Sequence, residues 1–332
     1  MEQAREKRIH YIDVAKGILI LMVVYGHVYG VMHANGIDNT FADYLHQSCN
    51  LFISFYMPCF FVITGWCSNF KQPFFQFVCQ SFKAIVFPGI TLSLLLLIRD
   101  INYESFYSFA KNVLFYGGYY WFLSSLFLAR IIVWIVTNWV DNIRSKIIVN
   151  ILLFVIGFIF GMFYHGFEPW WFIHALLLTP YISIGMLLKK HEINYVKASL
   201  LFTISFIITI VLSHINILNI GYFYHVPAIT QMLINLNPSM FISLILLSVT
   251  GSLMILGLSK WISANRILEY LGRNSLIIYC VHAFVLTILI RHFAVDGECI
   301  KIVFIYLLTV LICSMISFVL NLKYIRFIIG KF

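Results

Sequence analysis

The chain has 332 residues, of which 61% are hydrophobic and only 11% are charged, whereas soluble domains carry about 25% charged residues. A water-soluble fold could not bury so much apolar surface, so the composition excludes an ordinary soluble domain and favours a membrane protein. The net charge of +9 does not indicate nucleic-acid binding, because the cations fall in short segments between apolar runs. Since no linker, charge block or repeat divides the chain, we expect residues 1–332 to form a single domain.

Several segments reach the length of about 20 mostly apolar residues that a helix needs to cross a membrane. The predicted fold class is therefore all-α, a polytopic membrane protein with about ten transmembrane helices. The predicted spans are 12–34, 50–70, 77–98, 118–137, 147–163, 171–188, 197–215, 239–259, 274–292 and 300–320. The first run lacks a small-residue cleavage site and contains His27, so we interpret it as a span and not as a signal peptide.

Lysine and arginine are distributed unevenly between the alternate loops. If the N-terminus is cytoplasmic, the outer loops and adjacent helix ends contain only Arg99, Lys111, Arg291 and Lys301, and most other cations lie inside. Cytoplasmic loops of membrane proteins are enriched in lysine and arginine. The pattern therefore predicts that both termini are cytoplasmic.

The first span places ionisable groups inside an apolar helix. Residues 8–29 read RIHYIDVAKGILILMVVYGHVY. Lys16 and His27 are eleven residues apart, which puts them about three turns and roughly 16 Å apart on nearly the same helix face. Asp13 falls close to that face. Because ionisable groups are costly inside a membrane, all three residues are candidates for a functional role.

The same stretch resembles the opening helix of the acyltransferase 3 family of integral-membrane O-acyltransferases. That family has a basic residue, ten intervening residues and a histidine, and Lys16 and His27 fit this spacing. Further phrases resemble the family in the expected order along the chain. They include Asp13, Gly17 and Gly26 in the first span, Met57, Pro58, Phe60, Phe61 and Gly65 in the second, Trp121, Phe122, Leu123 and Leu126 in the fourth, Gly185 and Lys189 in the sixth, and Gly272, Asn274, Ser275, Tyr279 and His282 in the ninth.

Two positions depart from the family pattern. Tyr56 stands where the family often has histidine. The family often has a short cluster of basic residues before a proline, and here only Lys83 precedes Pro88. Lys83 could equally be a lysine whose side chain reaches the inner membrane surface.

The resemblance implies an O-acyltransferase of the bacterial-type inner (plasma) membrane, surrounded by membrane lipids. Its donor would be acetyl-CoA or another short acyl-CoA, and its acceptor a glycan or a lipid-linked sugar. The branch that it most resembles contains fucose 4-O-acetylase-like proteins and polysaccharide O-acetyltransferases. No metal and no nucleic acid is expected.

Acyl transfer to a hydroxyl needs a proton acceptor, donors for the oxyanion, and cations for the phosphates of the acyl donor. His27 would be the general base or a transient acyl carrier, and His282 a second catalytic residue. Asp13, Lys16 and Lys83 would bind the donor. Tyr56, Trp121 and Tyr279 are expected to bind substrate.

Other polar residues leave alternatives open. A histidine inside a membrane often forms hydrogen bonds between helices without any catalytic role. Arg130 lies about half a span deep and needs a carboxylate, a carbonyl, a water-filled cavity or access to the interface. Residues 216–238 suit either an ordered outer loop or a surface that contacts glycans.

The seven cysteines show no zinc-binding spacing. Cys49 and Cys299 fall in predicted outer loops, where a disulfide could form, although we expect free thiols.

A transporter of lipid-linked glycans or small solutes is the alternative function, because ten spans with scattered buried polar residues fit one too. The first span discriminates between the two classes, since a transporter has no evident need for Lys16 and His27 at that spacing.

Overall fold

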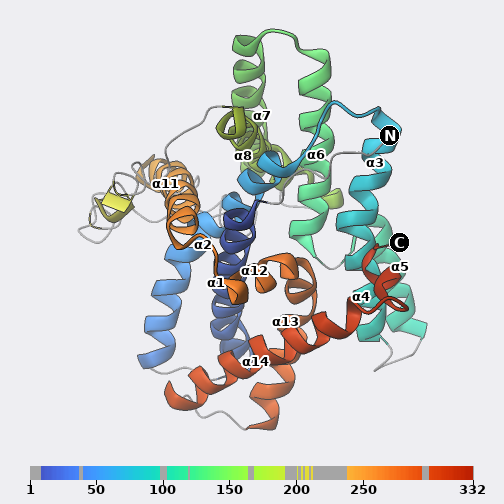
Figure 1. Ribbon diagram of the computed structural model, residues 1–332, viewed down its shortest axis with the longest axis vertical. Coiled ribbons are helices and arrows are strands. Elements are labelled where there is room, and N and C mark those ends of the chain that lie inside the picture. The colour runs from blue at the N-terminus through green and yellow to red at the C-terminus, as the bar shows by residue number, and fades with distance from the viewer. Residues whose placement is uncertain are drawn as a thin grey trace.

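The computed structural model describes residues 9–36, 40–97, 103–118, 120–163, 168–190, 200, 203–204, 206–208, 211, 238–293 and 299–331. These residues form helices joined by turns and contain no strand, which confirms the predicted all-α class. Figure 1 shows α6 and α7 as a hairpin at one end of the molecule and α14 at the other end. The helices and their bounds are α1 (His10–Ala34), α2 (Thr40–Cys67), α3 (Phe74–Ser81), α4 (Phe87–Leu97), α5 (Tyr103–Tyr116), α6 (Trp121–Trp139), α7 (Ile143–Phe163), α8 (Phe172–Lys190), α11 (Pro238–Ile262), α12 (Arg266–Arg273), α13 (Ser275–His292) and α14 (Cys299–Leu320).

Within the described residues, eight helical segments are long and apolar enough to cross a membrane, and Leu51–Cys67 is a shorter apolar helix at the predicted second span. The protein is therefore a multi-pass membrane protein. The predicted span 197–215 and the predicted loop 216–238 lie largely outside the described residues. The total of ten spans and the orientation of the termini stay predictions.

The region between the predicted second and fourth spans is more complex than the sequence indicated. The third span consists of α3, a π-helix at Phe82–Val86 and α4. The N–H of Phe87 donates to the carbonyl of Phe82, five residues back, and Pro88 has no N–H with which to restore the α-helical pattern. Lys111, which the sequence placed in an outer loop or at a helix end, lies within α5.

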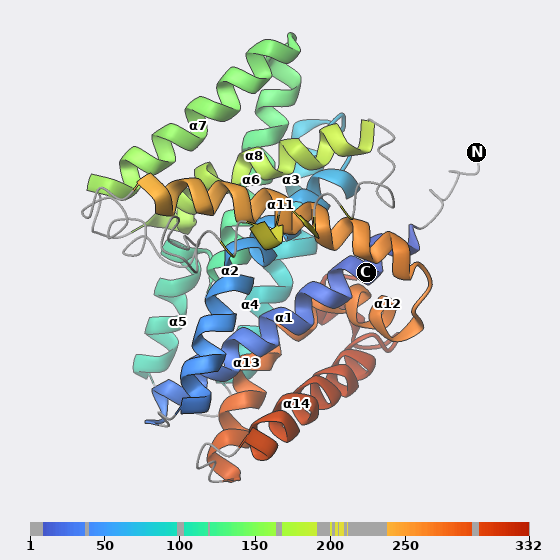
Figure 2. The ribbon, with the colours of Figure 1, turned by 90° about the vertical axis from the view of Figure 1, so that its left-hand side faces the viewer.

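Helix α1 lies at the centre of the helices that form the site. It packs against α2, α11, α12, α13 and α14, and Figure 2 shows it running between α11 and α14 with α12 near its N-terminal end. The side chains of Leu19, Val23 and Val24 have essentially no exposed surface. Because α1 is enclosed in this way, Asp13 and His27 in its interior face other helices.

Glycines allow four helices to approach closely in pairs. A Cβ atom at Gly17 would overlap the carbonyl of Leu268, and one at Gly272 would overlap the carbonyl of Asp13, so α12 rests directly on α1. Gly65 faces the carbonyl of Ile182 in the same way at the crossing of α2 and α8. Small residues are the usual means by which membrane helices reach such distances. The family-like glycines therefore have a packing role.

The cysteines are free thiols, as expected. Cys49 is buried and Cys299 is exposed, and no disulfide joins them.

Candidate functional site

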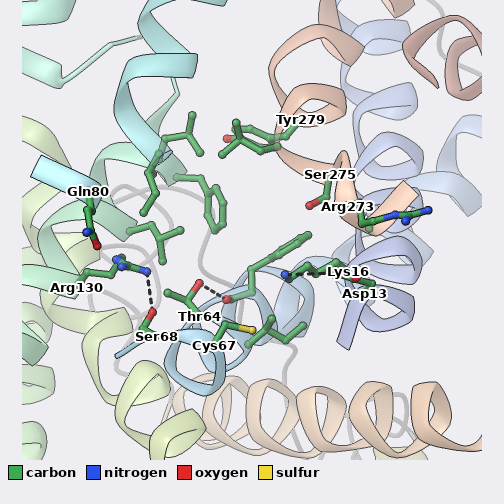
Figure 3. Close-up of a pocket in the computed structure, with 18 of the residues that line it drawn as sticks. Asp13, Lys16, Thr64, Cys67, Ser68, Gln80, Arg130, Arg273, Ser275 and Tyr279 are labelled. Atoms are coloured by element: carbon green, nitrogen blue, oxygen red, sulfur yellow. Dashed lines mark hydrogen bonds and ion pairs between the residues drawn. The ribbon is translucent and has the colours of Figure 1, made fainter. Parts of the chain in front are cut away.

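A cavity of about 560 Å³ lies among α1, α2, α3, α6, α12 and α13. Its volume is within the range of about 300–1,000 Å³ that small-molecule sites usually have. Apolar side chains, including Phe60, Phe122 and Leu126, cover part of its surface. The polar residues that line it are Asp13, Lys16, Thr64, Cys67, Ser68, Asn69, Gln72, Gln80, Arg130, Arg273, Ser275 and Tyr279. Figure 3 shows the labelled residues among them on separate helices around the cavity, with the side chain of Arg273 pointing away from the others.

One wall of the cavity carries Asp13, Lys16 and Arg273. The Nζ atom of Lys16 lies 3.8 Å from Oδ1 of Asp13, and Asp13 is in the first turn of α1, where the helix dipole favours a carboxylate. The side chain of Asn265 begins α12 by accepting hydrogen bonds from the N–H groups of Ile267 and Leu268, at 3.1 and 3.0 Å. Since α12 rests on α1, it brings Arg273 to the same wall.

Arg130 lies on the opposite wall, in α6. Its Nη1 donates to Oγ of Ser68 at 2.7 Å, and its Nε donates to Oγ of Ser81 at 3.2 Å. Its guanidinium carbon lies 5.1 Å from the centre of the Phe77 ring. Among the described residues, none of these partners is a carboxylate. Two hydroxyls and an aromatic face therefore fix the orientation of this cation without neutralising its charge.

His27 and His282 lie against each other between α1 and α13. Their ring centres are 4.5 Å apart and the rings are nearly perpendicular, at 84°. Nδ1 of His27 lies 2.9 Å from the carbonyl of Val23, and Nδ1 of His282 lies 2.8 Å from the carbonyl of Tyr279. Because a carbonyl can only accept, each Nδ1 carries the hydrogen, and each neutral ring keeps its lone pair on Nε2.

Nε2 of His282 is buried and has no hydrogen-bond partner among the described residues. Buried polar atoms without a partner are rare and require an explanation. The site thus holds two imidazole lone pairs in one place, which suits proton transfer.

The cavity and the histidine pair meet at Tyr279. This residue lines the cavity, and its ring centre is 5.9 Å from that of His282. Along α1, Lys16 stands at the cavity and His27 is eleven residues further on, a rise of about 16 Å. The structure therefore brings Asp13, Lys16, Tyr279, His27 and His282 into one continuous region.

Five of the predicted site residues lie outside the cavity lining, namely His27, His282, Tyr56, Lys83 and Trp121. Tyr56 is buried, and its hydroxyl oxygen is 3.4 Å from the position that a Cβ of Gly26, the residue before His27, would occupy. Lys83 is exposed in the π-helix. Trp121 packs its ring 5.1 Å from that of His174.

His174 belongs to a second buried polar pair. Glu168 Oε1 accepts from the backbone N–H of His174 at 3.0 Å and lies 3.0 Å from its Nδ1. Both side chains are buried, and neither lines the cavity. Trp121 is thus part of an aromatic and polar cluster separate from the cavity.

Four residues that line the cavity were not predicted as site residues from the sequence, namely Ser68, Gln80, Arg130 and Arg273. Arg130 had a sequence signal, namely a cation in the middle of an apolar span. Arg273 lies inside a family-like phrase, but the sequence predicted it only as a cation of a cytoplasmic loop.

Asn274 lies at the junction of α12 and α13. Asn274 occupies the cap position without a capping bond from its side chain. Its Nδ2 donates to the carbonyl of Tyr270, and its Oδ1 accepts from Asn321. Asn274 therefore ties α12 to α13 and α14.

The helical fold and the interior cavity define a multi-pass membrane protein with polar groups among its helices. The family model described as an acyltransferase domain matches residues 9–318, and the chain belongs to that family. No curated protein and no solved structure matches the chain. The match includes every predicted site residue, from Asp13 to His282, and makes the protein a membrane acyltransferase by family.

Proposed function

We propose that this protein is a membrane O-acyltransferase that moves an acetyl or another short acyl group from acyl-CoA to a hydroxyl of a cell-surface glycan or lipid-linked sugar. We place it in a bacterial-type inner membrane, in the branch of fucose 4-O-acetylase-like proteins and polysaccharide O-acetyltransferases. The observation that carries the proposal is the histidine pair next to Tyr279, a residue that lines a cavity together with Lys16 and Arg130. The family membership supports an enzyme over the alternative transporter.

The chemistry follows from the lone pair that a neutral His27 carries on Nε2. Its Nε2 takes the proton of the acceptor hydroxyl as the oxygen attacks the thioester carbonyl. The tetrahedral intermediate then collapses, the C–S bond breaks, and the thiolate of coenzyme A leaves and receives the proton. The carbonyl of Val23 holds Nδ1–H and so keeps Nε2 directed to the reacting hydroxyl.

The same lone pair permits a second route, in which His27 attacks the thioester and carries the acyl group itself. Coenzyme A would leave before the acceptor reacts. The two routes differ in an observable way, because an acyl carrier releases one equivalent of free thiol per enzyme without any acceptor. A burst of that size in rapid mixing with acetyl-CoA alone favours the carrier, and its absence favours the general base.

The test of the proposed function uses the full-length protein purified in lipid nanodiscs. We expect free thiol to appear from acetyl-CoA, with transfer of labelled acetyl to a glycan acceptor. The His27→Ala variant is the matched control, and it should release thiol no faster than empty nanodiscs. Uptake of glycan or solute by sealed vesicles, without thiol release under any acceptor tested, would instead support the transporter.

A further inference from the structure

The side chains of Glu168 and His174 form a buried polar pair outside the cavity lining. Nδ1 of His174 donates to the carboxylate of Glu168 at 3.0 Å. Because the carboxylate holds the hydrogen on Nδ1, a neutral ring keeps its lone pair on Nε2. His174 has no exposed surface, and this Nε2 has no hydrogen-bond partner among the described residues. Such a buried polar atom is rare and requires an explanation.

Helix capping explains the carboxylate but not the imidazole. Glu168 also accepts from the backbone N–H of His174 at 3.0 Å, which satisfies an N–H group in the first turn of α8. An apolar side chain at position 174 could pack against the same neighbours without burying a polar atom. The lone pair on Nε2 therefore indicates a ligand with a hydrogen to donate.

Two tryptophan rings flank His174. The ring centre of Trp121 lies 5.1 Å from that of the imidazole, and the ring centre of Trp171 lies 5.4 Å from it. The two indoles are 6.3 Å apart, and both are partly exposed, whereas the imidazole is fully buried. Accessible aromatic rings next to a fixed hydrogen-bonding group suit a sugar, because its C–H face stacks on an indole while a hydroxyl makes the hydrogen bond.

The backbone next to this cluster has an unusual conformation. Trp170 and Trp171 have φ values of 52° and 55°, in the left-handed region that residues other than glycine rarely adopt. Trp170 Nε1 donates to the carbonyl of Leu114 at 3.0 Å, and a Cβ atom at Gly117 would overlap the ring of Trp170. These contacts hold the turn in place and so fix the position of Trp171 beside the imidazole.

The cluster is connected to the proposed reaction centre through α6. Phe122 follows Trp121 and lines the cavity, and its ring centre is 5.3 Å from that of Tyr279, which contacts the histidine pair. In the predicted topology, α6 and α8 both begin at the outer surface, and α1 runs outward from Lys16 to the histidine pair. A ligand at the cluster would therefore approach the pair from the side opposite to Lys16.

We propose that the Glu168–His174 pair and the two flanking tryptophans bind the sugar of the acceptor. The indoles of Trp121 and Trp171 stack on the sugar ring, and Nε2 of His174 accepts a hydrogen bond from one of its hydroxyls. These residues position the sugar, and His27 takes the proton from the hydroxyl that reacts. The inference rests on the proposed function and names the residues that recognise its acceptor.

The experiment uses the full-length protein in lipid nanodiscs, with acetyl-CoA as donor. The acceptor is the lipid-linked surface glycan purified from cells that lack this protein. His174→Asn keeps an amide nitrogen at the position of Nδ1, and with it the contact to Glu168, but has no atom at the position of Nε2. It should raise KM for the glycan about fivefold, the usual effect of losing one hydrogen bond, and leave the affinity for acetyl-CoA unchanged.

The complementary variant is His174→Gln, whose amide reaches the position of Nε2 but gives up the contact to Glu168. It should keep KM for the glycan closer to the wild-type value than His174→Asn does. Removing the lipid from the glycan by mild acid separates recognition of the sugar from recognition of its anchor. The ratio of variant to wild-type KM should be the same for both forms, because the proposed contacts are made to the sugar.

A tryptophan at the other end of the same helix provides the matched control. Trp121→Leu should raise KM for the glycan, whereas Trp139→Leu, which removes an exposed tryptophan at the end of α6, should leave it unchanged. Trp121→Phe keeps an aromatic ring and should have an intermediate KM. This variant preserves the test if Trp121→Leu does not fold.

Four outcomes overturn the assignment. The first is an unchanged KM for the glycan in His174→Asn and in the Trp121 variants. The second is an equal loss of affinity for acetyl-CoA, which a purely structural role predicts. The third is a KM that His174→Asn preserves better than His174→Gln, because the contact to Glu168 would then matter and Nε2 would not. The fourth is an effect confined to the lipid-linked glycan.

Failure of the proposed function gives a different result. A wild type that binds the glycan at equilibrium but transfers no acetyl group to it refutes the proposed function. The same variants then test the sugar site through the Kd for the glycan. A wild type that does not bind the glycan overturns both.

Discussion

His27 combines three properties of a proton acceptor. It lies deep in α1, its Nδ1–H is held by the carbonyl of Val23, and its ring contacts His282. We expect His27→Ala to lower acyl transfer by about a hundredfold or more, the range that general bases typically contribute. Mass spectrometry of surface glycans, at equal membrane abundance of each variant, measures the effect.

His33→Ala provides the comparison on the same helix. His33 is exposed in the last turn of α1, and its removal should leave glycan acylation near the wild-type level. Near-normal acylation in the His27→Ala strain would reject the catalytic assignment.

Lys16 is predicted to act on the donor and not on proton transfer. It lines the cavity beside Asp13 and lies about 16 Å along α1 from His27, too far for a hydrogen bond. Lys16→Ala should therefore raise KM for acetyl-CoA with a smaller effect on kcat. Lys16→Arg keeps the charge and should retain much of the activity.

The alternative for Lys16 is a lysine that fixes the helix at the membrane interface. In that case Lys16→Ala would change expression or orientation and leave donor affinity alone. Direct binding of acetyl-CoA to the purified wild type and variant separates the two roles, and equal affinities would exclude a donor role.

At the scale of helices, the contact of α1 with α12 depends on Gly17 and Gly272. A Cβ atom at Gly17 would overlap the carbonyl of Leu268. Backbone cannot move aside as a side chain can, so we expect Gly17→Ala to destabilise the protein by about 1–3 kcal/mol, as overpacking usually does. The thermal unfolding midpoint in detergent should fall accordingly, and donor binding should weaken because Asp13 and Arg273 separate.

Gly30 is the matched control because it lies in the same helix with no atom within 4 Å of its would-be Cβ. Gly30→Ala should leave the unfolding midpoint unchanged or raise it slightly, since alanine favours helix more than glycine does. Equal midpoints for the two variants would show that the α1–α12 contact tolerates a methyl group.

The positions of the helices could be predicted from the sequence far better than the places where a helical segment is interrupted. Long apolar runs identify spans directly, because the bilayer sets both their length and their composition. The π-helix at Phe82–Val86 and the helix α5 depend on local bonding and on tertiary packing, which hydropathy does not encode. Lys83 was expected at the donor site from the family resemblance, and it lies outside the cavity lining.

At the scale of the whole molecule, the site assembles residues that are distant in sequence. Spacing within one helix was enough to associate Lys16 with His27, and the family-like phrases pointed to Tyr279 and His282. Arg130 and Arg273 come from α6 and α12, and only the packing of separate helices places them around one cavity. No periodicity in the sequence predicts such a grouping.

The topology gives the last prediction, that the cavity opens to the cytoplasm and both termini lie there. Cations predominate in the loops assigned to the inside, and the cavity is lined by Lys16 and Arg273, which this topology assigns to the inner side. Cys299 is exposed and follows a predicted outward span, whereas Cys67 is exposed and lines the cavity at the inner end of α2. The two thiols should therefore report opposite sides of the membrane.

Single-cysteine variants that retain either thiol test this arrangement in intact cells. A membrane-impermeant maleimide should label Cys299 from outside and should reach Cys67 only in inverted vesicles. Acetyl-CoA should slow the labelling of Cys67 in those vesicles and leave that of Cys299 unchanged, because only Cys67 shares the cavity with the proposed donor site. Two results would show the reverse topology: labelling of Cys67 from outside, or activity outside of a reporter fused after residue 332. In either case cytoplasmic acyl-CoA could not reach the cationic cavity.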